Sequence, residues 1–321
     1  MLRFASLCVL AALSGACFST DLDPDVVDAF ACGPDAGNAP CPDEQTCSVG
    51  RCRDTDTLPR LTIDGPANGD FVAFSAQTGD TFDTILQFSV AGAFDLVDPD
   101  ANAEHVFGEG HVVVSVDGTD LAPITMGTVA GGREIGINIP NIVGVHRISV
   151  ELRRNDGERY DHSEAVVRNI FWLSDGTPRV ALTRPWPGEQ FGPGEEIIEA
   201  EVGVIDFEIV NSGASPAFRE GHVHLHYNAP FPECPEREDG CDGGYFVVID
   251  APSPSGRFGR PNEGITAKLP EDTMLGDAEV TAVLRHVDHP PYRLPDEGDA
   301  DFSFPPMQGA VVFDTITISR Q

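Results

Sequence analysis

Residues 109–118 read EGHVVVSVDG, and residues 220–227 read EGHVHLHY. Both segments open on Glu-Gly-His and continue with apolar residues at every second position. These apolar residues are Val112, Val114 and Val116 in the first segment, and Val223, Leu225 and Tyr227 in the second. A period of two predicts a β-strand with one face in a core, and Asp117-Gly118 supplies a turn after the first strand. The same strand is therefore expected twice in this chain.

Four more pairs of segments recur in the same order around these strands. They are Pro59-Arg60-Leu61 with Pro178-Arg179-Val180, Gly69-Asp70-Phe71 with Gly188-Glu189-Gln190-Phe191, Phe88-Ser89-Val90 with Phe207-Glu208-Ile209, and Ala165-Val166-Val167 with Ala310-Val311-Val312. Anchors repeated in one order indicate an internal duplication. The second copy is longer mainly because of an insertion between about Asn228 and Asn262.

Each copy is expected to be all-β. Further alternating strands occur at Ile148-Val150-Leu152 and at Val280-Ala282-Leu284, and no stretch keeps a helical period over four turns. Short strands and abundant turn residues, 33 Gly and 26 Pro in 321 residues, favour β-sandwiches. The sequence thus predicts two tandem sandwiches.

One segment near the end of the first copy carries a family resemblance. Gly144-Val145-His146-Arg147-Ile148-Ser149-Val150-Glu151-Leu152, followed by Asn155-Asp156-Gly157, resembles the late-strand signature of bacterial immunoglobulin-like domains. The second copy has Ala278 in place of His146, and Asp288-His289-Pro290 in place of the turn. The resemblance implies immunoglobulin-like sandwiches, which serve as spacers, adhesion modules and binding modules alike.

The N-terminus has the features of an export signal. Arg3 supplies a positive charge, and the apolar stretch Phe4 to Leu13 is too short to span a bilayer. Leu13-Ser14-Gly15-Ala16-Cys17 resembles the lipobox of bacterial lipoproteins, which implies cleavage before Cys17 and lipidation of that cysteine. Phe18 and Ser19 provide no Asp retention signal, so outer-membrane placement is implied. Ordinary cleavage after Ala16, which would release a soluble protein, is the alternative.

The eight cysteines fit an oxidising compartment. Cys8 leaves with the signal; a lipidated Cys17 leaves six, which are Cys32, Cys41, Cys47, Cys52, Cys234 and Cys241. An even set predicts disulfides. The first four form a short module that allows three pairings, and its spacing lacks the close Cys-x2-Cys pairs of a zinc site. Cys234 and Cys241 are expected to close a loop within the insertion.

These observations predict five segments. They are a signal peptide (1–16), a lipidated cysteine with an acidic tether (17–31), a Cys-rich disulfide module (32–57), a first sandwich (58–176) and a second sandwich (177–321).

Charge excludes one class of partner. Fifty-two acidic residues against 20 basic ones give a net charge of −32, which repels phosphate backbones and argues against nucleic acid. A solvated surface explains the acidity without any ligand. The acidic loop Asp98 to Glu104 resembles a calcium loop but lacks the required glycine and the bidentate Glu, so a solvated loop is favoured.

Candidate chemistry is confined to one histidine stripe. His222, His224 and His226 alternate along a predicted strand, so their side chains share one face, with successive Cα atoms about 7 Å apart. With a further ligand from His286, His289 or Asp288, they could bind zinc or copper. Against this, the first copy keeps only His111 and has Val113 and Ser115 at the other places. We therefore expect the stripe to be exposed and to hold no cofactor, with His111 and His222 sharing a structural role and with His224 and His226 dispensable for folding.

The sequence contains no recognisable catalytic motif, so an enzyme is not expected. The predicted function is a non-enzymatic, lipid-anchored protein of the outer membrane or cell surface, for adhesion, envelope structure or binding of an unknown protein or glycan partner. The alternative is an extracytoplasmic copper- or zinc-binding protein that uses the histidine stripe.

Overall fold

The computed structural model describes most of the chain from residue 31 onward. The described residues are 31–33, 40–74, 79–100, 103–192, 199–210, 219–228, 245–249, 261–268, 276–287, 291–294 and 310–320. They form strands and two short 3-10 turns, η2 (Thr55–Thr57) and η3 (Ser163–Ala165), and within these ranges there is no α-helix. The chain divides into two compact units, Met1–Leu58 and Pro59–Gln321.

The first unit contains a small disulfide-bonded hairpin. Strand β1 (Gln45–Ser48) pairs antiparallel with β2 (Arg51–Asp54), and Cys47 lies opposite Cys52 in this pairing. Disulfides join Cys32 to Cys47 and Cys41 to Cys52. So few residues cannot bury enough apolar surface to fold by themselves, and the crosslinks replace a core.

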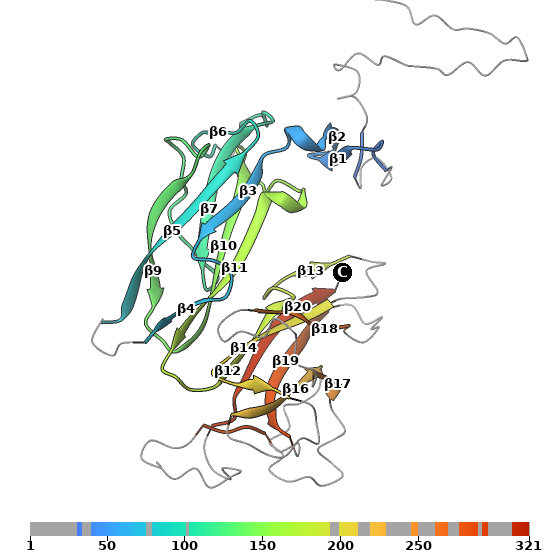
Figure 1. Ribbon diagram of the computed structural model, residues 1–321. Helices are drawn as coiled ribbons and strands as arrows, with labels where there is room; N and C mark the ends of the chain where they lie inside the picture. Colours follow the sequence, from blue (N-terminus) through green and yellow to red (C-terminus); the bar gives the residue numbers. More distant parts are fainter. Residues whose placement is uncertain are drawn as a thin grey trace, which may run out of the picture. The chain divides into compact units, whose positions relative to one another are not determined.

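The second unit contains two immunoglobulin-like β-sandwiches in tandem (Figure 1). In the first, one sheet has the order β3-β5-β9 and the other the order β4-β11-β10-β7-β6, with β8 also paired to β7. The bounds are β3 (Arg60–Gly65), β4 (Asp70–Ala73), β5 (Thr81–Ala91), β6 (Asp95–Leu96), β7 (Glu109–Val116), β8 (Thr119–Asp120), β9 (Arg133–Pro140), β10 (Gly144–Arg154) and β11 (Val166–Ser174).

The second sandwich repeats this topology with every strand number raised by nine. Its sheets have the orders β12-β14-β18 and β13-β20-β19-β16-β15, with β17 also paired to β16. The bounds are β12 (Arg179–Arg184), β13 (Gln190–Phe191), β14 (Glu199–Ile205), β15 (Glu208–Ile209), β16 (Glu220–Tyr227), β17 (Tyr245–Ile249), β18 (Pro261–Lys268), β19 (Gly276–His286) and β20 (Phe313–Arg320). The duplication predicted from the sequence is therefore present strand by strand.

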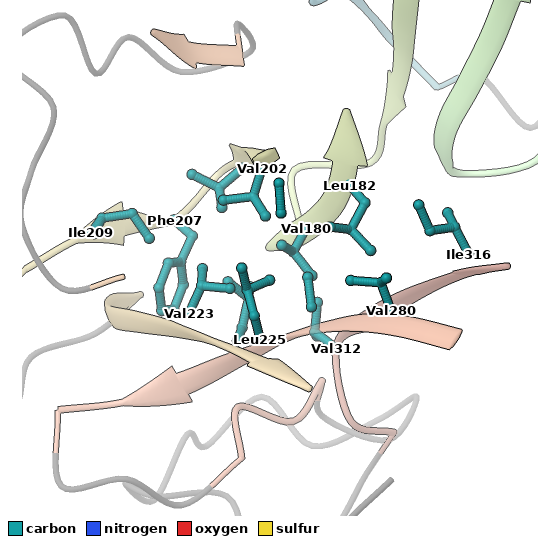
Figure 2. Packing of buried hydrophobic residues seen from close by; sticks show 14 of the residues in the cluster. Val180, Leu182, Val202, Phe207, Ile209, Val223, Leu225, Val280, Val312 and Ile316 are labelled. Atoms are coloured by element: carbon teal, nitrogen blue, oxygen red, sulfur yellow. The ribbon is translucent and has the colours of Figure 1, made fainter. Parts of the chain in front are cut away.

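The core of each sandwich lies between its two sheets. In the first copy, Phe88 and Leu86 of β5 are fully buried, as are Ile148 and Leu152 of β10. In the second, Val180 and Val202 from one sheet pack in one cluster with Val223 and Leu225 from the other (Figure 2). The alternating apolar residues of β7 and β16 thus face the cores, as their period predicts.

Two of the five anchor pairs are misaligned in the sequence comparison. Asp95 pairs with Glu109, and Glu208 pairs with Glu220, so Phe207 corresponds to Phe94 rather than to Phe88. The contacts agree: Phe94 lies edge-on to Tyr160, and Phe207 lies edge-on to Tyr292.

The second misalignment lies at the last strand of each copy. Val166 pairs with Glu151, and its counterpart Phe313 pairs with Val283. The Ala165 and Ala310 segments are therefore offset by two residues, which a pattern with period two cannot detect.

Candidate functional site

Three histidines of β16 lie on one face of the sheet. Val223 and Leu225 of this strand point into the core (Figure 2), so His222, His224 and His226 face the opposite side. The Nε2 atoms of His222 and His224 are 3.0 Å apart, and their ring centroids are 4.9 Å apart. The rings of His224 and His226 follow at 6.4 Å between centroids. The stripe predicted from the sequence thus exists, and two of its rings converge.

The expectation that the stripe is exposed is wrong. His222, His224 and His226 retain 0%, 2% and 1% of their accessible surface. The first copy buries the same face of β7, where Val113 and Ser115 retain 4% and 9%. Both strands are interior strands of their sheets, and both of their faces are buried. An alternation of residue types identifies the face that packs in the core, but it does not show that the other face is exposed to solvent.

The structure separates His286 from this stripe. His286 pairs with Gly221 in the β16–β19 register, so its side chain shares the core side with Val223 rather than the face of the histidines. Its ring lies 4.8 Å from that of Tyr292 between centroids. His286 is therefore not a ligand for a metal at the stripe, contrary to the sequence-based candidate set.

The first histidine of each strand faces an arginine. His222 pairs with Arg285 and His111 pairs with Arg153, at equivalent positions of the two copies. Burial, and after it the Arg153 guanidinium, lower the pKa of His111 below its usual 6.5. The His-Arg pair is a shared feature of the scaffold, whereas His224 and His226 belong to the second copy alone.

Other sequence candidates do not converge on a metal site. Within the described ranges, one group of three or more His, Cys, Asp or Glu side chains brings its ligand atoms within 4.8 Å of one another, namely Cys32, Cys41 and Cys52. Their sulfurs are held in disulfides, so these cysteines are not thiolate ligands. Asp98 and Asp100 of the acidic loop are not part of any such group.

His146 has a carboxylate partner. Its Nδ1 atom lies 2.7 Å from an Asp117 carboxylate oxygen, as in a catalytic dyad. Its Nε2 atom, however, lies 2.8 Å from the carbonyl oxygen of Ile142. With both nitrogens next to acceptors, the ring offers no free nitrogen to activate a nucleophile. His146 therefore ties β10 to neighbouring turns.

An arginine-lined pocket of about 240 Å³ lies within the second unit. Arg147, Arg159 and Arg168 are among the residues that line it, beside Trp186 and Glu189. Arg168 donates to Glu189 at 3.0 Å and lies over the Trp186 ring at 5.6 Å. Sequence reasoning missed this pocket because its arginines come from two strands, β10 and β11, and from the segment between them, and nothing in the sequence shows that they share a pocket. Arg147 is also paired with Asp314 at 2.6 Å, and Glu151 lies in the same wall, so carboxylates largely balance the charge of the arginines.

Several predicted residues lie outside the described residues. These are Cys17, Cys234, Cys241, Asp288 and His289. In the part of the chain that the structure describes, no helix has the length and apolarity needed to cross a membrane.

No family model and no curated protein matches this chain. Among solved structures, the fibronectin(III)-like modules of Clostridium thermocellum CbhA share 14% identity at a TM-score of 0.24, over 81% of this chain and 94% of theirs. The BSP domain structure of a biofilm associated protein shares 13% sequence identity at a TM-score of 0.21, over 82% of this chain and 30% of that chain. The calcium binding domain structure of CALX1.1 shares 12% sequence identity at a TM-score of 0.21, over 82% of this chain and 100% of that chain. Likeness at this distance says nothing about function.

Proposed function

We propose that this protein is a non-enzymatic surface lipoprotein that presents two immunoglobulin-like sandwiches outside the cytoplasm. The lipid on Cys17 would hold it to the outer membrane or cell surface. The sandwiches would serve adhesion, envelope structure or the binding of a protein or glycan partner. A stalk of stacked sandwiches can hold a binding surface away from a membrane without any chemistry of its own.

The disulfide module is the observation that carries this proposal. Cys32–Cys47 and Cys41–Cys52 follow the export-like N-terminus directly, and disulfides persist in oxidising compartments. The lipobox-like segment before Cys17 adds the anchor, since a removed signal peptide leaves no other apolar segment there.

The anchor is tested by Cys17→Ser in the full-length precursor. Wild-type protein is expected in the membrane fraction with labelled palmitate incorporated, because the lipid is its anchor. The variant is expected to lose the label and to move to the soluble extracytoplasmic fraction. Cys8→Ser is the matched control, since that cysteine lies in the removed segment and its loss should change neither readout.

The same experiment can contradict the proposal. A wild-type protein that never incorporates fatty acid is not a lipoprotein. Protease treatment of intact cells then reports which side of the outer membrane the sandwiches occupy: digestion indicates the cell surface, and protection indicates the periplasm.

A further inference from the structure

The histidine stripe of the second sandwich offers a pair of ring nitrogens at a spacing that suits a metal ion. Zinc–imidazole bonds of roughly 2.0–2.1 Å in tetrahedral geometry place two ligand nitrogens roughly 3.3 Å apart. The Nε2 atoms of His222 and His224 are 3.0 Å apart. We propose that these two histidines chelate one divalent zinc or copper ion through Nε2, with His226 next along the same face. This inference does not depend on the lipid anchor.

The rings of His222 and His224 are both buried within the fold. The strand also holds the two side chains in place, because β16 is paired along both edges, with β19 on one and with β15 and β17 on the other.

Among the described residues paired with the stripe, Arg285 opposes a cation. Arg285 pairs with His222, and like charges repel. The added histidines lie further along the strand, where His224 pairs with Val283 and His226 pairs with Thr281, which are both uncharged. An ion held by His222 and His224 would thus have Arg285 opposite one ligand and the uncharged Val283 opposite the other.

A hydrogen bond between the two imidazoles, one donating and the other accepting, would give the same distance. The two interpretations differ in what the protein takes up. A ring-to-ring hydrogen bond binds nothing, whereas a chelating pair binds one equivalent of ion.

The test is calorimetric titration of the mature full-length chain, stripped of metal with a chelator, with zinc sulfate and separately with copper(II) sulfate. One equivalent of at least one of the two ions is expected to bind. His224→Ala should weaken this binding at least about tenfold, because loss of a ligand costs no less than loss of its supporting partner. His111→Ala is the matched control at the equivalent strand of the first copy, and it should retain full binding.

A second pair of measurements covers the case in which His224→Ala does not fold. Copper(II) bound to the wild-type chain should show nitrogen hyperfine couplings in electron paramagnetic resonance. Val113→His, which places a second imidazole two residues after His111, should add a second equivalent. Binding of neither ion would overturn the proposal, and so would copper with oxygen ligands only, or uptake that a folded His224→Ala leaves unchanged.

Discussion

Strands β7 and β16 are the same strand in two copies, and they differ at four of their eight positions, two on the core face and two on the opposite face. Both contain a glycine and a histidine at the start, Gly110-His111 and Gly221-His222. In both, the histidine pairs with an arginine of the next strand. They diverge where Val113 and Ser115 of the first copy are replaced by His224 and His226 of the second. What the copies share belongs to the scaffold, and what they do not share is available for a function.

The largest expected effect tests the shared part. A Cβ added at Gly110 would collide with the carbonyl oxygen of Arg153, and one added at Gly221 with that of Arg285. A backbone carbonyl in a paired strand cannot move aside without breaking the sheet. Gly110→Ala and Gly221→Ala should therefore each lower the free energy of unfolding of their own sandwich by about 3 kcal/mol or more, measured by denaturant unfolding.

Gly136→Ala provides the control for that comparison. Gly136 lies in β9, and a Cβ there would meet no atom within 4 Å. Its substitution should change stability by less than about 0.5 kcal/mol. If Gly110→Ala and Gly221→Ala were as mild as this control, the close approach of the strands would not be a shared requirement of the two copies.

A smaller effect is expected from the insertion that only the second copy has. We predict that Cys234 and Cys241 form a disulfide, because the six residues between them are polar, Gly or Pro and suit a loop. The double variant Cys234→Ser/Cys241→Ser should lose about 2 kcal/mol of stability in the second sandwich. Mass spectrometry after alkylation without reduction checks the bond, and alkylation of both cysteines in the wild type would refute it.

The fold was predictable because duplication and strand period are local signals repeated over many residues. The anchor Glu109-Gly110-His111-Val112 with its counterpart at Glu220 located matching strands, and the structure places them identically in the two topologies. The predicted correspondence of Phe88 with Phe207 was wrong, because a single Phe in an apolar stretch does not specify the register of a strand. The contact with Tyr160 that identifies Phe94 as the counterpart of Phe207 spans 66 residues and leaves no local trace.

The site was predictable only in part. Alternation placed His222, His224 and His226 on one face, which the register bears out. It did not reveal that this face is buried, because burial depends on what packs against the sheet. It also could not show on which face of the sheet His286 lies. His286 directly follows Arg285 in the strand, so its side chain points to the opposite face. The arginine-lined pocket has no sequence signature, since Arg147, Arg159 and Arg168 come from different segments.

The smallest expected effect concerns His111, the histidine at the position that both copies share. It tests whether the fold keeps this ring neutral. The pKa of His111 lies below its usual 6.5 because the ring is buried and, secondly, because Arg153 is near. Below pH 6.5 the unfolded chain therefore binds a proton at this position that the folded chain does not. The stability that the fold gains from keeping His111 neutral is fully present above pH 6.5, and it is lost as the pH falls toward the lowered pKa.

The loss is limited to about 1.4 kcal/mol per pH unit for one proton. Between pH 7.5 and 5.5, the first sandwich of the wild type should thus lose up to about 1.4 kcal/mol more stability than His111→Gln. Denaturant unfolding of both proteins at the two pH values measures this difference. Arg153→Gln should show an intermediate pH dependence, because it removes the second cause of the shift and leaves the burial. Equal pH dependence in the wild type and His111→Gln would mean that the pKa of His111 is the same in the folded and the unfolded chain, so that the fold does not favour the neutral ring.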